Sequence, residues 1–142
     1  MVAARPADSV RPGYDLAMPD PRPLTLMTVH AHPDDETIGT GGTMAKAVKA
    51  GHRVVLVTCT RGELGEIVVK DMDTPDNHRR LGEIRAGELE SAMGVLGVTE
   101  WENLGYRDSG MMEDAGNRDP RSFWQADLDE AARRLTWLIR TH

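Results

Sequence analysis

The chain has 142 residues, enough for one domain with a hydrophobic core and too few for two ordinary domains. Its hydrophobic content of 39% and charged content of 28% are typical of a globular protein. No stretch approaches the roughly 20 apolar residues that a membrane span needs. The formal charge of −6 argues against non-specific nucleic-acid binding, which requires a surplus of Lys and Arg. We therefore expect neither a nucleic acid nor a membrane as a partner.

The cysteine and proline content of the chain indicates its cellular location and the boundaries of its domain. The one cysteine, Cys59, excludes an internal disulfide, so we expect a cytoplasmic, reducing location with Cys59 buried in a strand. Residues 1–23 hold five of the eight prolines and lack the apolar region of a secretory signal. We expect a disordered or surface-hugging tail over 1–23 and a domain over 24–142.

From residue 24 onward, apolar runs alternate with helical patterns. Residues 24–29 and 53–59 are apolar and rich in β-branched side chains without polar alternation. Such runs are typical of strands covered on both faces of a parallel sheet. A short helix is expected between them, from Gly41 to a left-handed cap at Gly51. The two strands and this helix form one right-handed βαβ unit.

The second half of the chain continues this alternation. Residues 60–77 show no sustained periodicity and are expected to form a long loop. Helices are predicted over 78–96 and 128–139, the latter with Asp127 as its N-cap, and a weak third strand over 101–104. The order predicts a Rossmann-like, three-layer α/β/α fold with a mainly parallel sheet. Three strands are few for such a sheet, so we expect a fold truncated at its C-terminus.

The segment His-Pro-Asp-Asp-Glu, residues 32–36, places an imidazole and three carboxylates directly after the first strand. Ligands bind at this end of the strands in open α/β sheets, and such close carboxylates repel one another unless a cation intervenes. His32 and Asp35 carry donor types that bind Zn²⁺, and Asp34 could take the proton of a metal-activated water. The alternative is an acidic helix start that complements the helix dipole.

Neighbouring side chains are predicted to support this cluster. Glu36 could orient a metal ligand from behind, and His30 of the first strand could support His32. Residues 39–42, Gly-Thr-Gly-Gly, lack the final glycine of a dinucleotide fingerprint and the Gly-Lys-Ser/Thr ending of a P-loop. The adjacent carboxylates would also repel a pyrophosphate, so nucleotide binding is not expected.

Three further charged residues are candidate substrate ligands. Arg85 lies on the inward stripe of the predicted 78–96 helix, where it needs an anionic or hydroxyl-rich partner. The alternative for Arg85 is a surface pair with Glu88 three residues later. Asp108 follows the third strand and Glu63 the second, so both are expected at the ligand-binding edge of the sheet. Asp108 alone could also be a turn residue.

Together, four motifs resemble the PIG-L/LmbE-like zinc-dependent N-acetylglucosaminyl deacetylases. In chain order they are residues 31–36 (AHPDDE), 57–65 (VTCTRGELG), 85–89 (RAGEL) and 107–110 (RDSG). The resemblance covers about residues 24–142. It is greatest to the actinobacterial branch of mycothiol metabolism, which includes the glucosaminyl-inositol deacetylase and the mycothiol-conjugate amidase.

The resemblance implies hydrolysis of an N-acetyl or related amide on a glucosamine-containing small molecule, such as N-acetylglucosaminyl-inositol or a mycothiol conjugate. It implies Zn²⁺ as the cofactor, with His32 and Asp35 as the first two zinc ligands and Asp34 as the general base. It also implies that Arg85 and Asp108 hold the sugar substrate.

The sequence departs from the family pattern after the last predicted helix. In the family, a further strand is followed by the third zinc ligand, a His in a His-Pro-Asp-His-like segment, and by the His that protonates the leaving amine; here the sequence ends at His142. Three expectations stay open: the amino-terminal part of a deacetylase, a split enzyme completed by another chain or a second copy, and a catalytically inactive sugar-binding remnant.

Overall fold

Three parallel strands form the centre of the molecule. The computed structural model describes residues 23–142, so the tail predicted over 1–23 lies outside the described residues except for its last position. One sheet has the order β1-β2-β3, and both pairings are parallel. Its strands are β1 (Thr25–His30), β2 (Arg53–Thr58) and β3 (Glu100–Asn103). The predicted parallel α/β sheet is confirmed.

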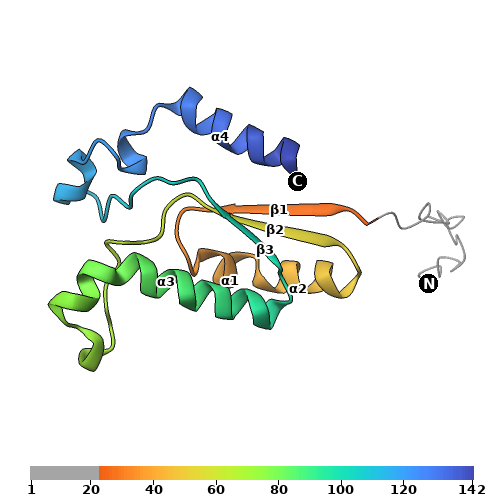
Figure 1. Cartoon of the computed structure of the whole chain (residues 1–142), viewed down its shortest axis with the longest axis horizontal. Helices are drawn as coiled ribbons and strands as arrows, with labels where there is room; N and C mark the ends of the chain where they lie inside the picture. The colour runs from red at the N-terminus through yellow and green to blue at the C-terminus, as the bar shows by residue number, and fades with distance from the viewer. Residues whose placement is uncertain (1–22) are drawn as a thin grey trace, which may run out of the picture.

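Helices cover both faces of this sheet (Figure 1). α1 (Asp35–Gly39) and α2 (Gly41–Lys49) connect β1 to β2, and α3 (Pro75–Leu96) connects β2 to β3. These three helices lie on one side of the sheet, whereas α4 (Leu128–Thr141) lies on the other. The loops contain three short 3₁₀ turns: η1 (Lys70–Met72), η2 (Ala115–Arg118) and η3 (Phe123–Gln125).

The central strand β2 divides the core into two apolar clusters. Val54 and Leu56 pack in the cluster with α2 and α3, and Val55 and Val57 pack in the cluster with α4. All four side chains are at most 4% exposed. The continuous apolar run in the sequence therefore reflects burial on both faces. Cys59 is a free, buried thiol in the α4-side cluster, as expected, but it lies one residue past the end of β2 and not within the strand.

Two helix starts show how capping residues set the boundaries. α3 begins at Pro75, three residues before the predicted start, because the Thr74 hydroxyl accepts a hydrogen bond from the Asn77 amide at 3.2 Å. α4 begins where predicted, since the Asp127 carboxylate accepts from the Glu130 amide at 2.9 Å. The short helix α1 is absent from our prediction because its five residues cannot show a helical period.

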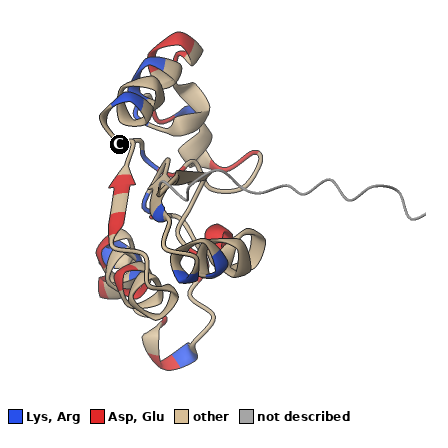
Figure 2. Cartoon of the chain, turned by 90° about the vertical axis from the view of Figure 1, so that its right-hand side faces the viewer, with Lys and Arg blue, Asp and Glu red and all other residues tan. Residues whose placement is uncertain are grey.

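Charges of both signs lie on the helix layers on either side of the sheet (Figure 2). Neither layer therefore carries charge of only one sign. Among residues 23–142, no helix combines the length and the apolar character that crossing a membrane would require. The segments that follow the three strands all leave the sheet at its carboxyl-terminal edge, where the predicted site residues lie.

Candidate functional site

A cleft of about 470 Å³ opens at the carboxyl-terminal edge of the sheet. This volume lies within the range of about 300–1,000 Å³ that small-molecule sites occupy. His32 and Asp34 reach the cleft from the turn after β1, Arg85 from α3, and Asp108 from the loop after β3. Parallel strands bring these segments together because all their carboxyl ends lie at one edge.

His32 and Asp35 form a pair with the spacing of two metal ligands. The His32 Nδ1 atom lies 3.4 Å from Asp35 Oδ2, and the side chains are 38% and 43% exposed. Asp35 Oδ2 also accepts from the His32 backbone N–H at 3.0 Å, which orients the carboxylate. In a tetrahedral zinc site with metal–ligand distances of about 2.0–2.2 Å, two donors lie about 3.4 Å apart. The pair therefore fits a zinc ion in donor type and in spacing.

This pair supplies two donors, which is fewer than a catalytic zinc site usually takes from its protein. Within residues 23–142, no group of three or more His, Cys, Asp or Glu side chains is placed to hold a metal ion. The described part of the chain thus offers two candidate donors, where a catalytic zinc site takes three.

Asp108 contacts the opposite side of the His32 ring. The His32 Nε2 atom lies 3.4 Å from Asp108 Oδ1, and Asp108 is only 4% exposed. The Asp108 carboxylate also accepts from the backbone N–H groups of Leu64 at 3.0 Å and Gly110 at 2.9 Å. Burial opposes ionisation of Asp108, but the contact with His32 and the two backbone donors outweigh it and hold its pKa below the ordinary value. The contact with Asp108 raises the pKa of His32 in turn, against the effect of desolvation.

Asp34 has a strained backbone that the surrounding side chains maintain. Its φ of 96° is unusual for a residue other than glycine, and such strain costs about 1–3 kcal/mol. The Asp34 N–H donates to Glu36 Oε2 at 2.9 Å, and the fully buried Glu36 also accepts from the Thr37 hydroxyl at 2.7 Å. Glu36 therefore holds the backbone of Asp34, whose own side chain remains 66% exposed in the cleft.

Arg85 ties α3 to the turn that carries Asp34. Its Nη1 donates to the Gly62 carbonyl at 3.1 Å, and its Nη2 donates to Asp34 Oδ2 at 2.8 Å and to the Pro33 carbonyl. The side chain is 16% exposed, which agrees with its inward position on the helix. Among residues 23–142 the ion pair of Arg85 is with Asp34 and not with Glu88. The guanidinium thus holds a catalytic candidate in place.

Two other predicted site residues make their hydrogen bonds within the protein. Glu63 Oε2 accepts from the Asp108 backbone N–H at 3.1 Å. His30 Nε2 lies 3.0 Å from the Thr40 hydroxyl, so the hydrogen bond of its ring goes to the residue between α1 and α2 and not to His32. Glu63 thus supports the backbone of Asp108 without lining the cleft, and His30 contacts the segment between α1 and α2.

Two glycines shape the cleft and are absent from our prediction. A Cβ atom built on Gly62 would lie 2.0 Å from Arg85 Nη1, and one on Gly65 would lie 2.7 Å from the same atom. Real Cβ atoms do not approach other atoms so closely, so both positions make room for the guanidinium. The sequence shows these glycines in the loop after β2, but it does not reveal that the Arg85 side chain packs against them.

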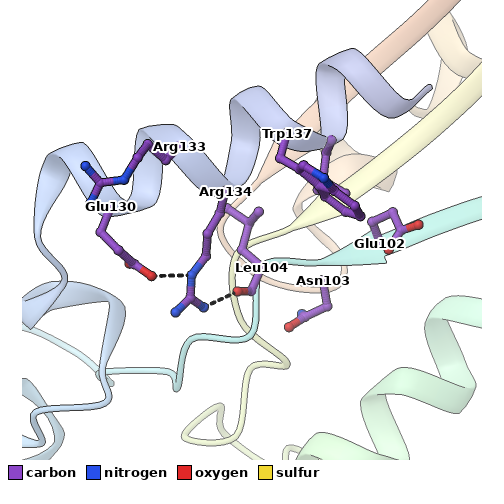
Figure 3. A pocket seen from close by; sticks show the side chains of 8 residues that line it. Glu102, Asn103, Leu104, Glu130, Arg133, Arg134 and Trp137 are labelled. Carbon is purple, nitrogen blue, oxygen red and sulfur yellow. Dashed lines mark hydrogen bonds and ion pairs between the residues drawn. The ribbon is translucent and has the colours of Figure 1, made fainter.

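A second groove, of about 490 Å³, lies between β3 and α4 (Figure 3). There Arg134 donates to the Leu104 carbonyl at 2.6 Å and to Glu130 at 2.5 Å, beside the 65% exposed Trp137. None of the predicted site residues lines this groove. The candidate site is therefore the cleft at the strand ends.

The fold and the cleft define the class of protein: an open α/β structure that gathers an imidazole, carboxylates and a guanidinium at the carboxyl ends of its parallel strands. The family model of the GlcNAc-PI de-N-acetylases (PIG-L) matches residues 27–142. The chain belongs to this family, and the resemblance inferred from its four motifs is confirmed.

Curated relatives are similar to most of the chain. It is 50% identical over 121 residues to the 1D-myo-inositol 2-acetamido-2-deoxy-alpha-D-glucopyranoside deacetylase of Geodermatophilus obscurus, which covers 81% of the chain and 41% of that protein. It is 48% identical over 141 residues to the deacetylase of the same name from Streptomyces scabiei, which covers 95% of the chain and 43% of that protein. The chain thus spans about two fifths of the length of these relatives.

A solved structure shares the fold at higher divergence. The N,N'-diacetylchitobiose deacetylase from Pyrococcus horikoshii, complexed with its inhibitor MPG, is 33% identical and superimposes with a TM-score of 0.55. The match covers 68% of this chain and 34% of that one.

Proposed function

We propose that this chain carries part of the active site of a metal-dependent hydrolase that removes the N-acetyl group from a glucosamine-containing small molecule. The observation that carries the proposal is that His32 and Asp34 line one cleft, with the Asp35 carboxylate 3.4 Å from the His32 ring. The names of the relatives support an N-acetylglucosaminyl-inositol as the substrate. A related amide, such as a mycothiol conjugate, is the second substrate class that fits this chemistry.

We assign His32 and Asp35 as ligands of a divalent ion, with Zn²⁺ as the proposed cofactor. Their 3.4 Å spacing and their partly exposed side chains support this assignment. When bound, such an ion would polarise the amide carbonyl and acidify the attacking water. Further donors would come from outside residues 23–142, for which the length of the relatives leaves room, or from a second copy or a complementing chain.

Asp34 is the proposed general base. Its exposed carboxylate lies next to the proposed ligand Asp35 in the chain, and Arg85 holds one of its oxygens at 2.8 Å. The carboxylate can therefore accept the proton of the water that attacks the amide carbon. Its strained backbone, fixed by Glu36, supports a functional role, since strain of this kind persists where the surroundings enforce it.

The remaining predicted residues form the walls of the site. Arg85 lines the cleft and is proposed to contact sugar hydroxyls in addition to holding Asp34. Asp108 also lines the cleft, and Glu63 supports Asp108 by accepting a hydrogen bond from the Asp108 backbone N–H.

The single buried thiol of Cys59 supports a reducing, cytoplasmic location for the protein.

Acetate release from 1D-myo-inositol 2-acetamido-2-deoxy-α-D-glucopyranoside, measured with the further metal donors supplied by a longer protein, a second copy or a complementing chain, tests the proposal. We expect release that a chelator abolishes and added Zn²⁺ restores. Asp34→Asn should lower the rate by about 10²–10⁴-fold, the usual contribution of a general base. Asp129→Asn, an exposed position on α4, is the matched control and should leave the rate unchanged.

Two results would overturn the assignment. Acetate release that is unaffected by Asp34→Asn would remove the proposed base. Binding of the sugar without bound metal and without acetate release would instead identify a sugar-binding remnant.

A further inference from the structure

The buried carboxylate behind His32 has a role that substrate binding does not describe. We propose that Asp108 is a positioning residue that fixes the His32 imidazole as the tautomer with its proton on Nε2, so that Nδ1 is the atom that binds the metal. This role rests on the proposed function and specifies which atom of the site contacts the ion.

The Asp108 carboxylate is enclosed and already accepts hydrogen bonds from the backbone. Its side chain is 6% exposed, and its oxygens accept hydrogen bonds from two backbone N–H groups, those of Leu64 and Gly110. An ionised carboxylate only accepts hydrogen bonds. A hydrogen on His32 Nε2, 3.4 Å away, satisfies this enclosed carboxylate, whereas water can satisfy the exposed Asp35 carboxylate beside Nδ1.

The other ring nitrogen, Nδ1, then faces the Asp35 carboxylate without carrying a hydrogen. In the neutral imidazole with its hydrogen on Nε2, Nδ1 presents a lone pair, and this atom lies 3.4 Å from Asp35 Oδ2. Two lone-pair donors so close repel unless a cation lies between them. Asp35 is 43% exposed and opens to solvent, whereas Asp108 is almost fully enclosed, so the accessible side of the ring is the Nδ1 side.

Asp108 is itself held from two directions, which gives it the rigidity that a positioning residue needs. Its backbone N–H donates to Glu63 Oε2 at 3.1 Å, while its own carboxylate accepts from the N–H of Leu64, the residue next to Glu63. This reciprocal pair locks the loop after β2 to the loop after β3. Carboxylates that orient a metal-binding histidine in this way typically change metal affinity by about 10–100-fold when they are removed.

Nitrogen-15 NMR of the imidazole groups reads the tautomer directly in the unmodified chain. In the metal-free protein, at a pH where His32 is neutral, we expect the signal of a protonated nitrogen for Nε2 and that of an unprotonated nitrogen for Nδ1. Added Zn²⁺ should shift the Nδ1 signal and leave Nε2 protonated. A proton on Nδ1, or a zinc-induced shift at Nε2, would overturn the proposal even if the protein deacetylates its substrate.

Metal affinity, measured by competition with a chromophoric chelator, provides the second test. We expect Asp108→Asn to weaken Zn²⁺ binding about 10–100-fold and to mix the two tautomers of His32. Asp119→Asn, a carboxylate of the same connection that pairs with Arg107 and Arg121, is the control and should change neither. Equal zinc affinity and an unchanged tautomer in Asp108→Asn would refute the role. Absence of acetate release would count against the proposed function alone, because the tautomer is measured without substrate.

Discussion

Replacing Gly62 by alanine tests whether the Arg85 guanidinium is held as tightly as the structure indicates. Gly62 has a φ of +66°, which costs a residue with a side chain about 1–2 kcal/mol. The new methyl group would also lie 2.0 Å from Arg85 Nη1 and 2.6 Å from its Cζ, so the guanidinium must move. Loss of one half-buried, charge-assisted hydrogen bond costs about 1.5–3 kcal/mol more. We expect Gly62→Ala to lower the free energy of unfolding by about 2.5–5 kcal/mol.

Substitutions at two other glycines distinguish the cost of backbone strain from the cost of the steric clash with Arg85. Gly51 has a φ of +80° and has no atom within 4 Å of the position that a Cβ would occupy, so Gly51→Ala should cost only the strain, about 1–2 kcal/mol. Gly87 lies inside α3 with open space around it, so Gly87→Ala should stabilise the protein by about 0.5–1 kcal/mol. Urea unfolding followed by tryptophan fluorescence measures all three variants.

A double-mutant cycle completes the test. In an Arg85→Ala background the collision disappears, so Gly62→Ala should then cost no more than Gly51→Ala. A Gly62→Ala variant that is no less stable than Gly51→Ala in the unmodified background would refute the close packing of Arg85 against the loop.

Further predictions concern the core, a helix cap and the response to acid. Leu56→Ala, in the fully buried centre of β2, should lower the free energy of unfolding by about 2–5 kcal/mol. Leu128→Ala, at an 81% exposed position, is the control and should change it by less than about 0.5 kcal/mol. Equal urea midpoints for the two variants would contradict the assigned core. Asp127→Ala should cost about 0.5–2 kcal/mol because it removes the acceptor for the Glu130 amide, and Asp127→Asn should retain most of that stability in thermal unfolding. Asp119, whose pKa its hydrogen bonds with Arg121 lower from 3.8 to about 2, contributes stability above pH 3.8 that is lost as the pH falls toward 2. Acid titrations of Asp119→Asn should therefore show a shallower loss of stability in that window, and an unchanged acid transition would argue against the pairing.

Patterns local in the sequence predicted the strands and the helix layers well. The uninterrupted apolar run of β2 and the acidic cap at Asp127 each reflect an interaction that spans few residues, so the printed sequence contains the signal. The start of α3 was also encoded, by Thr74 followed by Pro75, although the loop assigned to residues 60–77 extends past it.

The contacts within the site depend on tertiary structure and were less predictable. The inward position of Arg85 followed from helical periodicity, but its partners, the carbonyls of Pro33 and Gly62 and the carboxylate of Asp34, lie on two different loops. The contact between His32 and Asp108 arises because the segments that follow β1 and β3 meet at one edge of the sheet. No spacing along the chain indicates which nitrogen of the ring faces which carboxylate.

The Arg85 guanidinium binds Pro33, Asp34 and Gly62, which lie 52, 51 and 23 residues before it in the chain. These hydrogen bonds can form only after β1, β2 and α3 have docked, because no shorter stretch contains all the partners. Local opening of α3 would therefore remove the contacts between Arg85 and the turn at Pro33 and Asp34, while the strand pairings could remain. The Asp34 amide donates to the buried Glu36, so its hydrogen exchange follows the integrity of this turn, and faster exchange in Arg85→Ala would show that the guanidinium keeps the turn closed.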